Sequence, residues 1–184
     1  EKEQMKAMKV LVVGSGGREH AIIRKLKESP EIEELYCAPG NGGISADATC
    51  VSIPVSDITG MVKFAQEERI DLVVVAPDDP LVAGMVDAFE DAGIRAFGPT
   101  AKAAQIEGSK VFSKNLMQRY HIPTADYQVF DESEAAISYI KERGSYPVVI
   151  KADGLALGKG VIIAQNFEEA ADAVHSMIEG RLFG

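Results

Sequence analysis

A glycine-rich segment near the start of the chain has the composition of a loop that binds an anion. It lies between an apolar run, Met8–Val13, and a stretch with the apolar spacing of a helix, Arg18–Glu28. A turn from a buried strand into a helix gathers backbone N–H groups and the positive end of the helix dipole at one point. A tight turn needed only for packing is the alternative, because glycine clusters alone are weak evidence. The candidate anion site comprises Gly14, Ser15, Gly16, Gly17, Arg18 and Glu19.

The spacing of these glycines argues against a dinucleotide ligand. The fingerprint of dinucleotide-binding proteins has glycine at its first, third and sixth positions. Gly14 and Gly16 fill the first two positions, but Glu19 stands at the sixth. The next predicted strand, Glu34–Ala38, also lacks a terminal acid that could hold a ribose. NAD binding is therefore disfavoured.

Two further loops follow predicted strands in the same half of the chain. One contains Asn41 and Gly42, and an asparagine side chain both donates and accepts hydrogen bonds. The other contains Asp78, whose carboxylate could bind a ribose hydroxyl or an amine. Because the carboxyl ends of parallel strands converge on one crevice, we expect the three loops to lie side by side. The alternatives are a flexible turn at Asn41 and a helix cap at Asp78 or Asp79.

Lysine and glycine dominate the candidate chemistry of the second half. A predicted strand ends at Lys151, and a loop containing Gly154, Gly158, Lys159 and Gly160 leads into another strand. Glycines let a backbone close over phosphates, and lysines neutralise their charge. The loop is not a P-loop, because it joins two strands and does not open a helix. The alternative is an ordinary hairpin, and Lys110, taken alone, is a surface lysine.

Bulk composition excludes several classes of protein. The apolar and charged fractions, 46% and 26%, are ordinary for a globular chain of 184 residues. A net charge of -9 disfavours nucleic acid and anionic membranes as partners, and no apolar run approaches the ~20 residues of a membrane span. Two cysteines favour a reducing cytoplasm over a disulfide framework. Neither a metal site nor a serine or cysteine nucleophile is expected in this chain.

The candidate residues need a scaffold, and alternating strand and helix patterns predict an α/β fold with a doubly wound parallel sheet over residues 8–100. The predicted strands are Met8–Val13, Glu34–Ala38, Cys50–Ile53, Leu72–Ala76 and Ile94–Phe97. The predicted helices are Arg18–Glu28, Asp57–Arg69 and Pro80–Ala92.

The pattern changes at about residue 101, where a second domain, 101–184, is expected. Ala101–Tyr120 reads as a helix with a break near Gly108, and Pro123 marks a linker. A small α+β lobe follows over about 123–184, and two of its helices open with a capping-box pattern, Asp131 with Glu134 and Asn166 with Glu169. Its predicted elements are Tyr127–Phe130, Val148–Ala152 and Val161–Ala164 as strands and Glu132–Arg143 and Phe167–Glu179 as helices.

In their order along the chain, these motifs resemble those of the phosphoribosylamine–glycine ligase family, also called glycinamide ribonucleotide synthetases, which have the ATP-grasp fold. The resemblance covers nearly the whole chain after Met8. The segments that carry it are Gly14–His20, Pro39–Asn41, Phe97–Pro99, Glu107–Lys110, Ile122–Ala125, Lys151–Ala156 and Gly158–Val161.

The resemblance implies an ATP-dependent ligase of purine biosynthesis that joins glycine to 5-phosphoribosylamine. Phosphoribosylamine would lie on the N-terminal sheet, a pre-ATP-grasp domain, with its phosphate near Gly14–Gly17, and the cofactors would be ATP and Mg²⁺. ATP would convert the glycine carboxylate, a poor electrophile, into glycyl phosphate, which the amine attacks while the protein positions the reactants. Gly154–Gly160 would form a mobile cover over ATP. The implied ATP-binding residues are Lys110, Lys151, Asp153, Gly154, Gly158, Lys159 and Gly160.

Two departures from the family pattern matter. The family usually has Glu where this chain has Asp78, and its members are well over twice as long. We therefore expect a fragment, inactive alone, whose missing part holds the catalytic residues, the Mg²⁺ or Mn²⁺ ligands and most of the glycine site. The alternatives are another ATP-grasp ligase of purine synthesis, against which Arg18-Glu19-His20 argues, and a non-catalytic nucleotide-binding module.

Overall fold

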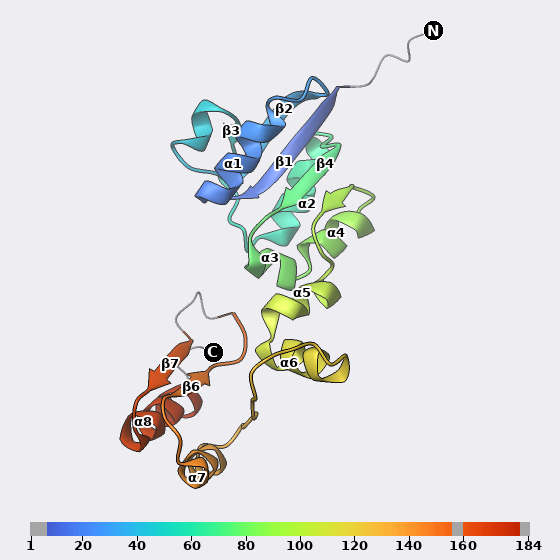
Figure 1. Ribbon diagram of the computed structural model, residues 1–184. Helices are drawn as coiled ribbons and strands as arrows, with labels where there is room; N and C mark the ends of the chain where they lie inside the picture. The colour runs from blue at the N-terminus through green and yellow to red at the C-terminus, as the bar shows by residue number, and fades with distance from the viewer. Residues whose placement is uncertain (1–6, 156–159, 181–184) are drawn as a thin grey trace. The chain divides into compact units, whose positions relative to one another are not determined.

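The computed structural model describes residues 7–155 and 160–180 of the chain (Figure 1). Their contacts divide the chain into two units, one ending at Gln105 and the next beginning at Ile106. Each unit is described by itself. No helix of the described part is long and apolar enough to cross a membrane.

The first unit is built on a five-stranded parallel sheet, so the predicted doubly wound fold is confirmed. The strand order is β3-β2-β1-β4-β5, with β1 in the centre. β1 is flanked on both sides, since Val12 pairs with Cys37 on one side and Val74 on the other. The strands are β1 Met8–Gly14, β2 Ile32–Pro39, β3 Thr49–Cys50, β4 Leu72–Val75 and β5 Ala96–Phe97.

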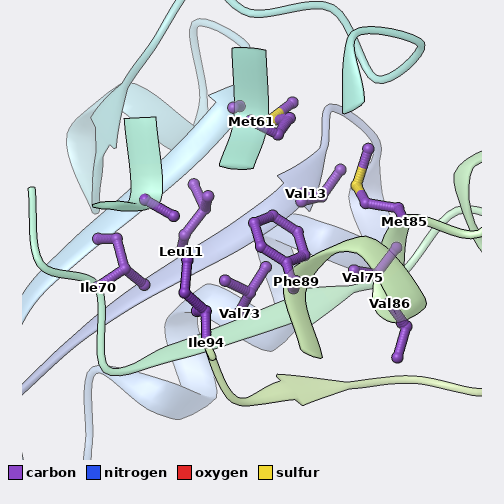
Figure 2. Close-up of a cluster of buried hydrophobic side chains, with 12 residues drawn as sticks. Leu11, Val13, Met61, Ile70, Val73, Val75, Met85, Val86, Phe89 and Ile94 are labelled. Carbon is purple, nitrogen blue, oxygen red and sulfur yellow. The ribbon is translucent and has the colours of Figure 1, made fainter. Parts of the chain in front are cut away.

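Helices cover both faces of this sheet because β1 is apolar and buried from Val10 to Val13. Its side chains alternate, so Leu11 and Val13 pack with α2 and α4, whereas Val10 and Val12 pack with α1 and Ile44. Figure 2 shows the first of these clusters, in which Phe89 lies among side chains of β1, β4 and α2. The helical segments are α1 Gly17–Leu26, η1 Ile44–Ala46, α2 Ile58–Glu67, α3 Asp78–Val82 and α4 Met85–Asp91.

The second unit contains a two-stranded antiparallel sheet and two helices that pack on it. β6 (Val148–Lys151) pairs with β7 (Val161–Ala164), and α7 (Ser133–Arg143) and α8 (Phe167–Ile178) supply a small core around Ala164. Before them come α5 (Ala101–Gly108), which spans the boundary between the units, and α6 (Lys110–Arg119).

Three sequence predictions about local structure are wrong. The helix expected over Pro80–Ala92 is divided at Gly84, which has a positive φ of 88°. Tyr127–Phe130 forms no strand, because its backbone has no partner strand among the described residues. Asp131 does not cap α7, whose N-cap is Glu132 without a side-chain hydrogen bond. The cap at Asn166 is confirmed by its 2.9 Å bond from the Glu169 amide.

Two phenylalanines offer a matched test of this core. Phe89 is fully buried, whereas Phe97 is 70% exposed. We expect Phe89→Ala to lower the free energy of unfolding of the first unit by about 3–5 kcal/mol, because truncation leaves a cavity between α4 and the sheet. Phe97→Ala should change it by less than about 0.5 kcal/mol. Urea unfolding followed by circular dichroism measures both, and equal losses would contradict this account of the core.

Candidate functional site

The turn from β1 into α1 is shaped around the buried side chain of Glu19. This side chain is 5% exposed, and its Oε2 accepts a hydrogen bond from the Gly16 amide at 2.5 Å. A methyl group at Gly14, where φ is +130°, would lie 2.5 Å from Cγ of Glu19. The carboxylate therefore occupies the space beside the turn, at the sequence position where a dinucleotide-binding protein has its third glycine.

Donors remain at this turn after Glu19 has taken the Gly16 amide. Gly17 and Arg18 belong to the first turn of α1, whose amides have no partner within the helix. The Arg18 guanidinium is exposed, donates to the Ala76 carbonyl at 3.4 Å and lies 3.8 Å from the Asp78 carboxylate. Arg18 thus connects the first glycine loop with the loop that follows β4.

The second loop is held against the first by Asn41. Its Nδ2 donates to the Ser15 carbonyl at 2.7 Å, and its Oδ1 accepts from the amides of Gly43 and Ile44 at 2.8 and 2.9 Å. The predicted donor and acceptor capacity of Asn41 is therefore used mainly to shape the loop. One amide hydrogen of Nδ2 is left for a ligand.

Asp78 and Asp79 lie in the first turn of α3, whose N-cap is Pro77. Neither aspartate caps the helix, so the capping alternative is wrong for both. Side-chain exposure at Asp78 is 48%, which leaves its carboxylate accessible to a ligand beside Arg18.

The expectation that these loops lie side by side is confirmed. The Gly40 amide donates to the Gly14 carbonyl at 3.0 Å, Asn41 reaches Ser15, and Arg18 reaches the loop after β4. All three loops follow the carboxyl ends of parallel strands, which is where ligands bind in such sheets. What these residues bind stays a prediction.

In the second unit, the segment around Ser109 and the segment around Asp153 are about 40 residues apart in the sequence, and they contact each other at the start of α6. Asp153 accepts hydrogen bonds from the Ser109 hydroxyl at 3.0 Å and from the Val111 amide at 3.2 Å. Lys110 Nζ donates to the Gly154 carbonyl at 2.7 Å. Asp153 thus satisfies donors at the N-terminus of α6 and joins the hairpin to that helix.

The electrostatics of Asp153 follow from these bonds. Its burial raises the pKa of the carboxyl, but hydrogen bonds from Val111, Ser109 and neighbouring amides outweigh burial and bring the pKa below its ordinary value. The ionised carboxylate is therefore the form that holds the hairpin to α6.

Sequence reasoning missed an exposed apolar face beside Lys151. Val149, Val161 and Ile163 are 50%, 43% and 58% exposed, and they share one face of the β6–β7 sheet with Lys151. The backbone of Lys151 pairs with Val161, but its ammonium group has no hydrogen-bond or ion-pair partner among the described residues. The alternation of side chains between the two faces of both strands could have indicated this exposed face, because α7 and α8 cover only the opposite face of the sheet.

Gly158 and Lys159, and most of the mobile cover predicted at Gly154–Gly160, lie outside the described residues. Gly160 is buried, and its carbonyl accepts from the Ala152 amide at 2.8 Å. Within the described ranges, no group of three or more His, Cys, Asp or Glu residues could hold a metal ion.

Two family models match the chain in succession. Residues 8–107 match the N domain of phosphoribosylglycinamide synthetase, and residues 108–184 match the ATP-grasp (A) domain of the same enzyme. Phosphoribosylamine–glycine ligase of Escherichia coli K12 is 54% identical over 179 residues, and that of Caldanaerobacter subterraneus is 52% identical over 177. Each alignment covers 96% of this chain and 42% of the relative, so the chain spans less than half the length of these relatives.

Solved structures agree with these matches. The crystal structure of phosphoribosylamine–glycine ligase from Thermotoga maritima has a TM-score of 0.75 and 32% identity, covering 95% of this chain and 40% of that one. The biotin carboxylase domain of 2-oxoglutarate carboxylase from Hydrogenobacter thermophilus, solved with MgADP and bicarbonate, has a TM-score of 0.72 and 25% identity, covering 94% and 42%.

The lowered pKa of Asp153 predicts a pH dependence. A carboxyl whose pKa is lower in the folded state stabilises the fold above its unfolded pKa, near 3.8, and loses that contribution as pH falls toward the folded pKa. Asp153→Asn should therefore destabilise the second unit near neutral pH, and the difference from wild type should shrink below that value. Thermal unfolding across pH measures this, and a difference independent of pH would contradict it.

Proposed function

The chain belongs to the phosphoribosylglycinamide synthetase family, and on that premise we propose that it supplies the phosphoribosylamine site and part of the ATP site of a phosphoribosylamine–glycine ligase. In the reaction, ATP phosphorylates the carboxylate of glycine. The amine of phosphoribosylamine then attacks the glycyl phosphate carbonyl, an amide bond forms and phosphate leaves. The observation that carries the proposal is the 2.7 Å bond from Asn41 to Ser15, which brings two glycine loops together at the ligand edge of a parallel sheet.

Within the first unit, residues 8–100 are proposed as the domain that binds the amino sugar. The phosphate would accept hydrogen bonds from the first-turn amides of Gly17 and Arg18, where the helix dipole favours an anion. Asp78 carries an accessible carboxylate that accepts hydrogen bonds from ribose hydroxyls or from the amine. Asn41 contributes its remaining amide hydrogen and keeps the two loops in register.

Within the second unit, residues 101–184 are proposed as part of the ATP-grasp domain. Lys151, whose ammonium group has no partner among the described residues, lies beside the apolar face of Val149, Val161 and Ile163, a combination suited to phosphates and an aromatic base. Lys110 uses one of its three donors on Gly154, so two remain for phosphate oxygens. Mg²⁺ would neutralise the transferred phosphoryl group. Among the described residues no group of three or more His, Cys, Asp or Glu could hold a metal ion.

The proposal is tested by binding, because phosphoribosylamine is short-lived in water. Titration calorimetry of the chain with glycinamide ribonucleotide, the stable product, should show one site that is independent of MgADP. MgADP should bind separately, and Lys151→Ala should weaken MgADP without changing the affinity for glycinamide ribonucleotide. A chain that folds but binds neither ligand at millimolar concentration would refute the proposal.

Gly17 permits a sharp test of the phosphate position. A Cβ there meets no atom within 4 Å, so substitution does not disturb the turn. Gly17→Asp should preserve stability, because an acid in the first turn suits the helix dipole, yet weaken glycinamide ribonucleotide by ~tenfold or more through repulsion of its phosphate. Gly17→Asn, of equal size without the charge, should weaken it much less. Equal effects of the two substitutions in calorimetry would place the phosphate elsewhere.

A further inference from the structure

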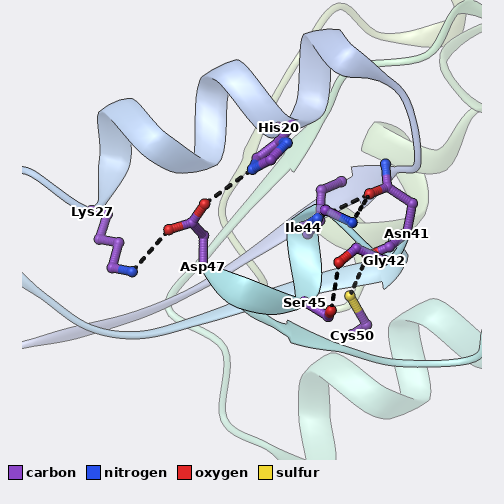
Figure 3. Close-up of polar contacts among 9 residues, drawn as sticks. His20, Lys27, Asn41, Gly42, Ile44, Ser45, Asp47 and Cys50 are labelled. Atoms are coloured by element: carbon purple, nitrogen blue, oxygen red, sulfur yellow. Dashed lines mark hydrogen bonds and ion pairs between the residues drawn. The ribbon is translucent and has the colours of Figure 1, made fainter.

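The segment from Gly40 to Asp47, which carries the second glycine loop and η1, is fastened to the rest of the first unit at both ends. At one end Asn41 bonds to Ser15. At the other end the Asp47 carboxylate accepts hydrogen bonds from His20 Nε2 of α1 at 3.0 Å and from Nζ of Lys27, the C-cap of that helix, at 2.9 Å (Figure 3). The loop between these two points is the part that would meet a ligand.

His20 and Lys27 reach the same carboxylate because they are seven residues apart, which places them on one face of α1. A carboxylate only accepts hydrogen bonds, so His20 donates from Nε2. The bonds from His20 and Lys27 lower the pKa of Asp47, which keeps the acceptor ionised.

The imidazole of His20 also lies beside the loop. A Cβ at Gly43 would lie 3.4 Å from Cε1 of His20, so the ring occupies the space next to this glycine and a side chain there would be in contact with it. His20 begins the second turn of α1, three residues beyond Gly17, and therefore stands between the first-turn donors and the second loop. Its side chain is 29% exposed and that of Asp47 24%, so solvent competes only partly with their bond.

We propose that His20 is a positioning residue, which holds Asn41-Gly42-Gly43 against the first glycine loop so that the sugar-phosphate site is formed before the ligand arrives. The inference rests on the proposed function, because it assumes that these loops bind the amino sugar phosphate. Preformed loops strengthen binding, since the backbone freedom of the glycines is then lost during folding and not during binding.

A merely structural histidine would behave differently, and the chain contains one for comparison. His175, on α8, bonds to Glu179, the C-cap of that helix, at 2.8 Å, and the two side chains are 43% and 60% exposed. The pair joins an imidazole to a carboxylate, as His20 and Asp47 do, but its two residues are only four positions apart and both belong to the second unit. His175→Leu is therefore the matched control for His20→Leu.

The experiment measures the affinity of the chain for glycinamide ribonucleotide by calorimetry, together with amide hydrogen exchange at residues 42–47 without ligand. His20→Leu should weaken binding by about tenfold, the loss of a hydrogen bond to a charged group, and should speed exchange in that segment. His20→Gln places an amide donor near the position of Nε2 and should restore most of the affinity. His175→Leu should change neither quantity.

Asp47→Ala removes the acceptor from the loop side and leaves α1 unaltered, so it serves if His20→Leu proves unstable. It should lose at least as much affinity, because it also removes the bond from Lys27. The double variant should lose no more than Asp47→Ala alone, because the bond between His20 and Asp47 is already absent in that variant. The positioning role is overturned if His20→Leu keeps wild-type affinity and exchange, or if His20→Gln is as defective as His20→Leu. If the wild-type chain fails to bind glycinamide ribonucleotide, the proposed function fails, and exchange at residues 42–47 still decides whether His20 holds the loop.

Discussion

The candidate site of the first unit depends on how its central strand ends. β1 is buried on both faces and paired on both edges, so the chain can leave it only by a turn with little room for side chains. At Gly14 that turn takes a φ of +130°, and Glu19 fills the space that a side chain would need. The bond from Gly16 to Glu19 then sets the start of α1. The residue at which this helix begins determines the positions of Arg18 and His20. Through their contacts it also determines the positions of the two neighbouring loops.

Both units shape a glycine-rich segment with a carboxylate of their own. Glu19 takes one amide at the start of α1, and Asp153 takes an amide and a hydroxyl at the start of α6. The first amides of an isolated helix have no partner and could donate to a phosphate. Each carboxylate accepts hydrogen bonds from some of these donors, so fewer of them are left for a ligand. In the second unit the proposed ATP site would therefore depend more on the ammonium groups of Lys110 and Lys151, since Asp153 accepts hydrogen bonds from the Val111 amide and the Ser109 hydroxyl.

The sequence was informative where one local pattern decides the structure. Burial of β1 and β4 followed from their apolar runs, and the meeting of three loops followed from parallel topology. It failed where a partner distant in the chain decides. The hydrogen bonds of Asp153 with Ser109 and Val111, which lie more than 40 residues earlier, were not expected, whereas its contact with ATP stays a prediction. Tyr127–Phe130 has the composition of a strand, yet a strand needs a neighbour, which periodicity cannot supply.

The acidic balance of the chain makes the few local donors decisive. With a net charge of -9, the average field repels both sugar phosphates and ATP, so neither ligand is attracted by the surface as a whole. Attraction must come from groups that act over short range: first-turn amides at Gly17 and Arg18, and the ammonium groups of Lys110 and Lys151. Backbone dipoles act only when their geometry is fixed, because a mobile turn points its N–H groups in many directions. On the proposed function, selectivity for a small phosphorylated ligand over nucleic acid would depend on fixed glycine loops, so the contacts made by Glu19, Asn41 and Asp47 would matter as much as the groups that touch the ligand.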